Sequence, residues 1–534
     1  MTAIGYRNDE DEFSLEVAGA LRRPSQAGKE GYRAVAGVSR ATKLRILYCH
    51  PMQNPLTPVM LSLSKHLPTT AAREFAAPER SFRSFRMTLG VEVGAGRGFR
   101  LQTGRTPTPC LSGPTARVIL RSMDAPPQAP AGTTTTTTNW RGSLRAGLVI
   151  FLVLRIGLSA WAALATSLQP VPTTPDEITR PYLGQVPLER GVVGALLAPW
   201  QRFDTNRYLR IADVGYANGE DSVFPPLYPW LMRGGGWLLR LGQKGTPRQR
   251  TASHLIAGIL VSNLAAVGVF ALTHWWGGRL LGEENGRRAA VYLALFPTSF
   301  FLIAAYTESL FIFLAIASLV LARRGRFGTA GGLAFLATLT RTTGVGLMLP
   351  LGHLALRHFQ AHPGEKRRIA TLLAALLPGV AFGLFLLLRA GAGLPPIAGV
   401  YAQEWHQTTT FPGSDLLTAL QIIVSGEGIR AGEITLVVDF LVALALVAVT
   451  ALSFRRLGTG HGLYCLVLLL FVFLPRSDLK PLYSFSRYAL AFYPGFFLLA
   501  LAGRNPVVHR LVLYPGLLLL LYLSGQFFIW GWVA

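Results

Sequence analysis

The feature that most constrains this chain is a series of apolar runs of membrane-spanning length, which recur from Leu148 to the C-terminus. A helix needs about 20 apolar residues to cross the hydrocarbon core of a bilayer. Of the 534 residues, 51% are apolar and only 15% are charged. Backbone polar groups in lipid must pair within the protein, which favours helices. We therefore expect an all-α polytopic membrane protein.

Hydropathy predicts about 11 transmembrane helices, several of them too short to cross unaided. The predicted spans are Gly147–Leu168, Leu255–Trp275, Ala289–Tyr306, Ser309–Ala322, Gly328–Leu339, Gly344–Leu356, Ile369–Leu388, Ile434–Ser453, Leu463–Leu474, Tyr488–Ala502 and Leu511–Val533. Basic residues gather in the loops between every second pair of spans. The positive-inside rule then predicts a cytosolic N-terminus, an extracytoplasmic C-terminus and a location in the cell membrane.

Of the net charge of +24, residues 1–140 account for +8, with 18 basic and 10 acidic side chains, and the remaining +16 lies largely in these predicted cytosolic loops. It indicates topology and affinity for anionic lipid rather than nucleic acid, which would call for a basic face with interleaved aromatic residues in a soluble domain. No nucleic-acid partner is expected. The chain also lacks a Walker motif and a GxGxxG turn after a strand, so no nucleotide cofactor is expected.

Residues 1–140 have a different composition from the rest of the chain. They contain no apolar run of spanning length, and they include an uninterrupted threonine run from Thr133 to Thr138. We predict that this region is disordered. Two interpretations remain open: a genuine cytosolic tail, or a spurious extension with the true start at Met123. The membrane domain is predicted to occupy residues 141–534.

The most informative loop is Trp200–Arg233, a polar, acid-bearing stretch between two predicted spans. Apolar side chains follow Asp204 at helical spacing, which predicts a short interfacial helix with Asp204 at its N-terminal end. There Asp204 could be a helix cap or a general base. Three prolines between Phe224 and Arg233 predict an extended corner. This corner could be a membrane-surface anchor or a wall for a lipid-linked or sugar-bearing substrate.

Two further charged residues interrupt apolar runs. Glu308 joins two predicted spans almost without a loop, and acids at that depth are costly and often functional. Arg341 lies in a hairpin between two short runs, where it could bind phosphate or extend to the interface. His406 could ligate a metal with Glu404 or Asp204, but one histidine with dispersed acids favours polar contacts to a sugar. No required metal is expected.

Several ordered motifs resemble the PIG-V type mannosyltransferases, named for the second mannosyltransferase of GPI-anchor assembly, and their bacterial relatives. The resemblance covers residues 147–534. Its pieces are Phe203-Asp204 with Tyr208, Ile211-Ala212 and Gly215-Tyr216, then Phe224 to Arg233, Phe296-Pro297 through Glu308-Ser309, Leu339-Thr-Arg341 with Gly344, Ser486-Arg487-Tyr488, and Gly531 to Ala534. Phe203 departs from the family, which usually has tryptophan before the aspartate.

This resemblance implies a GT-C glycosyltransferase fold with a large first extracytoplasmic loop bearing short interfacial helices. It implies a polyprenyl-phosphate sugar donor, a lipid-linked or envelope acceptor, and inverting single displacement. Asp204 would be the base, and Glu308 would position the acceptor or support the site. Arg341, Lys480 and Arg487 would bind the donor phosphate. The expected substrate contacts are Tyr208, Tyr228, Glu404 and His406.

Two other functions remain open. A transporter or flippase of lipid-linked sugars also uses broken helices and intramembrane charges, but it should show an internal repeat. We find no repeat between the halves of the sequence, and most charged candidates fall in loops predicted to share one face. A catalytically inactive protein of the same fold is the remaining possibility.

Overall fold

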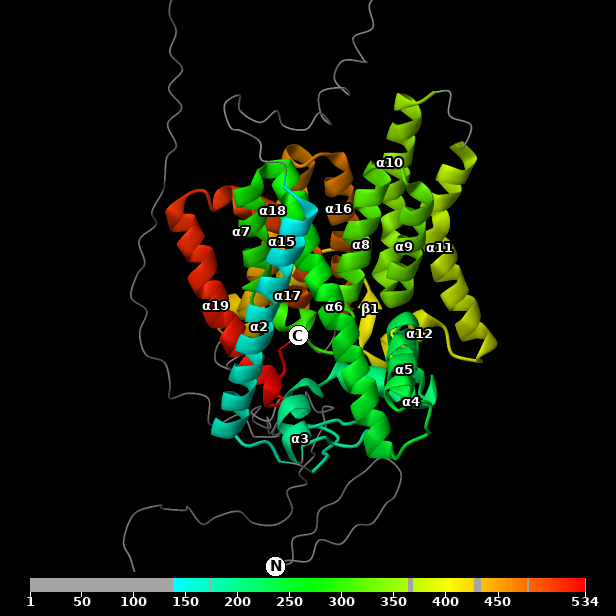
Figure 1. Ribbon diagram of the computed structural model, residues 1–534, viewed down its shortest axis with the longest axis vertical. Helices are drawn as coiled ribbons and strands as arrows, with labels where there is room; N and C mark the ends of the chain where they lie inside the picture. Colours follow the sequence, from blue (N-terminus) through cyan, green and yellow to red (C-terminus); the bar gives the residue numbers. More distant parts are fainter. Residues whose placement is uncertain are drawn as a thin grey trace, which may run out of the picture. The chain divides into compact units, whose positions relative to one another are not determined.

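The computed structural model describes residues 138–172, 174–189, 191–363, 368–426, 434–477 and 480–533. The predictions for residues 1–137, including the start at Met123, lie outside the described residues. The described part is almost entirely helical (Figure 1). Five of its helices are long and apolar enough to cross a membrane, and a sixth span is possible if a bent helix pair counts as one. These helices support a multi-pass membrane protein.

The five long helices match five of the predicted spans. They are α2 (Trp140–Leu168), α6 (Pro247–Leu281), α11 (Arg368–Gly391), α15 (Ile434–Arg456) and α19 (Pro506–Phe528). Helix α6 is central, because it packs against α2, α5, α7 and α8. It starts sharply at a capping box in which Thr246 and Gln249 satisfy each other's backbone N–H groups, with Pro247 at the first helical position.

The connection between α2 and α6 carries short helices at one end of the bundle (Figure 1). They are α3 (Gly191–Leu197), η1 (Ala198–Trp200), α4 (Asp204–Val214), η2 (Gly219–Val223) and α5 (Leu227–Leu239). The predicted extended corner is confined to Phe224, Pro225 and Pro226, because α5 starts at Leu227 and takes Pro229 into its first turn. Helix α5 then packs along α6, so the connection returns to the bundle.

The middle of the chain is broken into shorter elements. They are α7 (Glu283–Ala294), η3 (Ser299–Leu302), α8 (Glu308–Arg323), α9 (Phe327–Thr340), η4 (Thr342–Leu347) and α10 (Met348–Ala361). The predicted span Ala289–Tyr306 is therefore wrong as one continuous helix. Pro297 lacks a backbone N–H and disfavours helical geometry at Phe296, and the chain continues as buried turns up to Glu308.

The remaining elements complete the bundle. They are α12 (Ile397–Glu404), β1 (Gln407–Thr409), α13 (Ser414–Ser425), α16 (Thr459–Phe473), β2 (Pro475–Ser477), α17 (Phe485–Tyr488), η5 (Ala489–Ala491) and α18 (Tyr493–Ala502). Strands β1 and β2 are antiparallel, with Gln407 opposite Ser477. The α17–η5 segment meets α18 at an 85° bend. This bend divides the predicted span Tyr488–Ala502 and places Arg487 just before it.

Candidate active site

Two acids and two arginines from distant parts of the chain form one buried cluster. Arg487 Nη1 donates to Asp204 Oδ2 at 2.6 Å, and its Nε donates to Glu308 Oε1 at 2.5 Å. Arg341 Nη1 donates to the same Glu308 oxygen at 2.5 Å and to Thr307 Oγ1 at 3.3 Å. The side chains are 4–17% exposed. One guanidinium thus holds both carboxylates, and the second holds one of them.

Three breaks in helical structure bring these side chains together. Asp204 is the first residue of α4, Glu308 is the first residue of α8, and Arg341 lies between α9 and η4. After Arg341 the backbone folds tightly against α9, where a Cβ on Gly344 would come within 2.6 Å of the Thr338 backbone. Arg487 lies in the one-turn helix α17. Helix ends position all four residues.

The backbone before Asp204 is strained and tightly packed. Phe203 has φ of 47°, a left-handed conformation that is unusual for a bulky residue. Its ring packs against Phe527, Trp530 and Trp532, with centroid distances of 5.3–5.8 Å. Asp204 therefore follows an aromatic cluster built with the C-terminal end of α19. The helix-cap interpretation of Asp204 is wrong, because Phe203 occupies the cap position and no side chain caps α4. The Asp204 carboxylate pairs with Arg487 instead.

A second set of ion pairs fixes α4 against η2. Arg210 binds Asp221 at 2.6 Å and Glu220 at 2.5 Å, and Arg207 binds Glu220 at 2.9 Å. Burial alone would raise the pKa of Glu220, but the charges of Arg207 and Arg210 outweigh burial and hold it below its usual value. Trp405 adds a further contact to η2, because its Nε1 donates to the Glu220 carbonyl at 3.1 Å.

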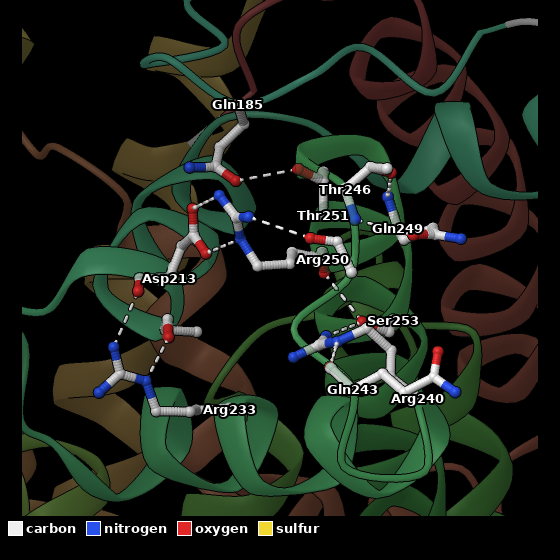
Figure 2. A network of polar contacts seen from close by, with 12 residues as sticks. Gln185, Asp213, Arg233, Arg240, Gln243, Thr246, Gln249, Arg250, Thr251 and Ser253 are labelled. Carbon is white, nitrogen blue, oxygen red and sulfur yellow. Dashed lines mark hydrogen bonds and ion pairs between the residues drawn. The ribbon is translucent and has the colours of Figure 1, made fainter.

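The other end of α4 is tied to the following helices (Figure 2). Arg250 Nε donates to Asp213 Oδ1 at 2.7 Å, and Arg233 donates to the carbonyls of Ala212 and Asp213 at 2.6 and 2.8 Å. Arg233 belongs to α5 and Arg250 to α6. Helix α4 is thus held at both ends, which fixes the direction in which Asp204 projects.

A small pocket of about 20 Å³ lies beside the cluster. Its charged lining is Glu308, Arg341 and Arg487, and most of the remaining lining is apolar: Phe311, Ile312, Leu468, Val472, Ala491 and Phe492, with Thr343 and Tyr488. Within the described residues, Glu308 Oε2 is buried without a hydrogen-bond partner. Arg487 donates to the two carboxylates through Nε and Nη1, and Arg341 donates to Glu308 and Thr307 through Nη1. The site therefore presents an acceptor oxygen and guanidinium donors beside an apolar wall.

Two predicted substrate residues, Tyr208 and Tyr228, are buried among other side chains. Tyr208 is buried against the rings of Phe224, Tyr228 and Tyr306, and its hydroxyl lies 3.4 Å from Thr307 Oγ1. Burial, reinforced by the charge of Asp204, raises the pKa of Tyr208, so its phenol stays protonated. The Tyr228 hydroxyl lies 2.8 Å from Ser262 Oγ and donates to the Gly258 carbonyl at 3.0 Å.

Three other predicted site residues lie outside the cluster. Glu404 and His406 are exposed at the end of α12. Lys480, predicted to bind phosphate, donates to Thr435 Oγ1 at 2.8 Å and pairs with Asp439 at 3.4 Å. Across the described ranges, no three His, Cys, Asp or Glu side chains are grouped closely enough to hold a metal ion.

Sequence reasoning missed Asp439, which is fully buried in α15. Its Oδ1 accepts from the Ser486 backbone N–H at 2.9 Å while Oδ2 pairs with Lys480. It therefore anchors the residue immediately before Arg487. A lone acid within the apolar run 434–453 was the available signal, because acids inside spans are rarely without a role. Trp405 was missed too, and its loop position gave no comparable signal.

We expect Asp439→Asn to lower the free energy of unfolding by about 2 kcal/mol, because it leaves the Lys480 ammonium without its counter-charge in a largely buried place. The double variant Asp439→Asn/Lys480→Met should recover most of that loss. Thermal unfolding of the purified protein in detergent measures both. Equal destabilisation of the single and double variants would contradict this account of the pair.

Comparison with known proteins gives matches to part of the chain. No protein-family model matches the chain. GPI alpha-1,6-mannosyltransferase 2 of Cricetulus griseus is 34% identical over 162 residues, which are 30% of this chain and 32% of the relative. The protein of the same name from Mus musculus is 32% identical over 207 residues, 36% of this chain and 41% of the relative. Over these segments, the chain is similar to GPI mannosyltransferases.

This similarity confirms the resemblance that the motifs indicated. The chain spans about a third to two fifths of the length of the curated relatives it matches. Among solved structures, an oligosaccharyltransferase from Archaeoglobus fulgidus is 13% identical, with a TM-score of 0.33, over 69% of this chain and 53% of that one. ArnT from Cupriavidus metallidurans is 16% identical, with a TM-score of 0.32, over 61% and 71%. At these TM-scores neither likeness establishes a common fold.

Proposed function

We propose that the chain is an integral-membrane glycosyltransferase of the GT-C class. It would move a hexose, in our proposal mannose, from a polyprenyl-phosphate donor to a lipid-linked or envelope acceptor. The observation that carries this proposal is the pocket in which Arg341, Arg487 and Glu308 meet an apolar wall. The partial similarity to mannosyltransferases supports the choice of mannose.

The pocket's two kinds of lining correspond to the two parts of such a donor. An isoprenoid chain requires apolar contacts, which Phe311, Leu468 and Val472 would supply. Its phosphate requires charged N–H donors, and guanidiniums suit phosphate because their donors form a fixed fork. Arg341 and Arg487 would supply them. No nucleotide is part of this donor, in keeping with the lack of a nucleotide-binding motif.

Donor binding would also affect the base. In the unliganded arrangement Arg487 Nη1 is hydrogen-bonded to Asp204 Oδ2. If the phosphate of the sugar donor accepts a hydrogen bond from Arg487 Nη1, it competes with Asp204 for that N–H group. The Asp204 carboxylate would then be released from Arg487. Binding of the leaving group and freeing of the base would then be one event.

The proposed reaction is a single displacement. The acceptor hydroxyl oxygen attacks the anomeric carbon, the bond from that carbon to the phosphate oxygen breaks, and Asp204 takes the hydroxyl proton. The bonding electrons leave with the polyprenyl phosphate, whose charge Arg341 and Arg487 offset. Attack opposite the leaving group inverts the anomeric centre. Glu308 Oε2, the unpartnered oxygen, would accept a hydrogen bond from a sugar hydroxyl and orient it.

We further propose that this site faces the extracytoplasmic side, with the N-terminus of the first span in the cytosol. The basic residues that favour this orientation include Arg287 within α7, and Arg324 and Arg456 at the ends of α8 and α15. Glycosylation would then use a donor presented on the outer leaflet, and the acceptor would approach along the short helices α4 and α12.

A flippase of lipid-linked sugars is the second candidate, because the same pocket could hold a lipid phosphate without chemistry. Sugar transfer and flipping can be distinguished in vesicles that contain the purified protein, labelled polyprenyl-phosphate mannose and extracted envelope lipids. We expect a new mannosylated product, with donor crossing no faster than in protein-free vesicles. Accelerated crossing without a product would contradict the glycosyltransferase proposal and favour the flippase.

A further inference from the structure

A second, basic cavity lies away from the acid–arginine cluster. It measures about 290 Å³ and is lined by Glu284, Arg287, Arg288, Val291, Gly503, Arg504, Pro506 and His509. One wall is α7, and the other is the turn between α18 and α19. Because one water molecule occupies about 30 Å³ in the liquid, the cavity has room for a group of several heavy atoms.

The charges that line this cavity are unbalanced. Three guanidiniums face one carboxylate, Glu284, which pairs with Arg287 at 2.8 Å and with Arg288 at 3.0 Å. Arg504 has no acidic partner among the described residues, and its Nε donates instead to Asn285 Oδ1 at 3.4 Å. That amide oxygen also accepts from Arg288 at 3.1 Å. Excess positive charge thus converges on a concave surface, where an anion would be stabilised.

The cavity lies at one end of a candidate membrane span, where lipid headgroups are expected. Pro506 is the first residue of α19, a candidate membrane span, and Arg504 lies two residues before it. From there α19 continues with exposed apolar side chains, including Val507, Leu511 and Leu518. The far end of α19 contacts Phe203 beside Asp204, so the cavity and the proposed active site are separated by roughly 34 Å, the length of a 23-residue helix.

The frame of the cavity is fixed. The Tyr292 hydroxyl lies 2.7 Å from His509 Nδ1, which joins α7 to α19. Asn505 caps α19 by accepting from the Val507 N–H at 2.8 Å. The dipole of α19 adds partial positive charge at this end of the helix. These contacts hold the backbone of α7 and α19 around the space, while the side chains of Arg287 and Arg504 are exposed to a ligand.

We propose that this cavity binds the phosphate-bearing headgroup of an anionic phospholipid. The excess of guanidiniums would pair with the phosphodiester, and the acyl chains would extend along the lipid-facing part of the bundle. Basic pockets between membrane helices on the cytoplasmic side bind anionic headgroups by this chemistry. The site is independent of sugar transfer and would anchor the end of α19 that lies farthest from Asp204.

Titration of the purified full chain with phosphatidylglycerol in neutral detergent, followed by native mass spectrometry, tests the proposal. Arg287→Gln and Arg504→Gln should each weaken lipid binding about fivefold. Arg456→Gln, an exposed arginine at the end of α15, is the matched control and should change nothing. Glu284→Gln should bind the lipid more tightly because it removes the opposing charge.

Arg287 is 63% exposed, so its substitution leaves folding intact and keeps the test interpretable if Arg504→Gln misfolds. Equal lipid binding by Arg287→Gln and Arg456→Gln would overturn the proposal. Displacement of the lipid by an equal concentration of glycerol 3-phosphate or inorganic phosphate would also overturn it, since the ligand would then be a free anion. Resistance to both soluble anions supports a lipid ligand.

Discussion

Replacing Asp204 with asparagine is expected to slow sugar transfer by about 10²–10⁴-fold, the usual contribution of a positioned general base. The substitution preserves the shape of the side chain and an oxygen that can accept from Arg487, so the variant should fold and bind donor. The loss should therefore appear in kcat, with KM for the donor nearly unchanged. Initial rates at several donor concentrations, with protein amounts matched, measure both constants.

Glu308→Gln is the comparison that separates the two acids. Glu308 is hydrogen-bonded to both guanidiniums and is 4% exposed, so neutralising it should reduce stability and donor affinity together. If Asp204→Asn instead raised KM with kcat intact, Asp204 would be a binding residue. If Glu308→Gln alone removed turnover while leaving stability unchanged, the base would be Glu308.

Replacing Arg487 with glutamine is expected to have the largest structural effect, a loss of about 3–5 kcal/mol in unfolding free energy. The side chain bridges Asp204 and Glu308, and its removal leaves two carboxylates close together with only Arg341 to offset them. Arg487→Lys should recover only part of the loss, because one ammonium cannot reproduce the guanidinium fork. Thermal unfolding in detergent measures this series.

Arg456→Gln is again the matched control, since that arginine is exposed at the end of α15. It should unfold like the unmodified protein. Stability of Arg487→Gln within the range of this control would show that the cluster contributes little to folding and would contradict the assignment of Arg487 as its central cation.

The apolar pattern of the sequence predicted the five long helices well, because a run of about 20 apolar residues leaves few alternatives. It failed at Ala289–Tyr306, where hydropathy continues but Pro297 ends the helix. The pattern could not distinguish a crossing helix from buried turns, since both are apolar. The predicted total of about 11 spans, the orientation and the disorder of residues 1–140 stay predictions.

The predicted site residues fall into two groups: those that contact one another in the acid–arginine cluster, and those that contact other residues. Asp204, Glu308, Arg341 and Arg487 come together, although Asp204 and Arg487 are 283 positions apart. Ordered motifs marked these residues but could not show which acid each arginine contacts. The sequence could not show that Lys480, a predicted phosphate ligand, pairs with Asp439 on another helix. It also could not show that the hydroxyl of Tyr228, a predicted substrate contact, faces Ser262. Both roles stay predictions.

The most direct measurement of the central claim supplies the purified protein with labelled mannose as either polyprenyl-phosphate mannose or a nucleotide sugar. The acceptors are lipids and glycans extracted from a host that lacks the protein. We predict transfer from the lipid-phosphate donor only, with inversion at the anomeric carbon. Transfer from the nucleotide sugar, or donor binding without transfer to any acceptor fraction, would contradict the proposed glycosyltransferase.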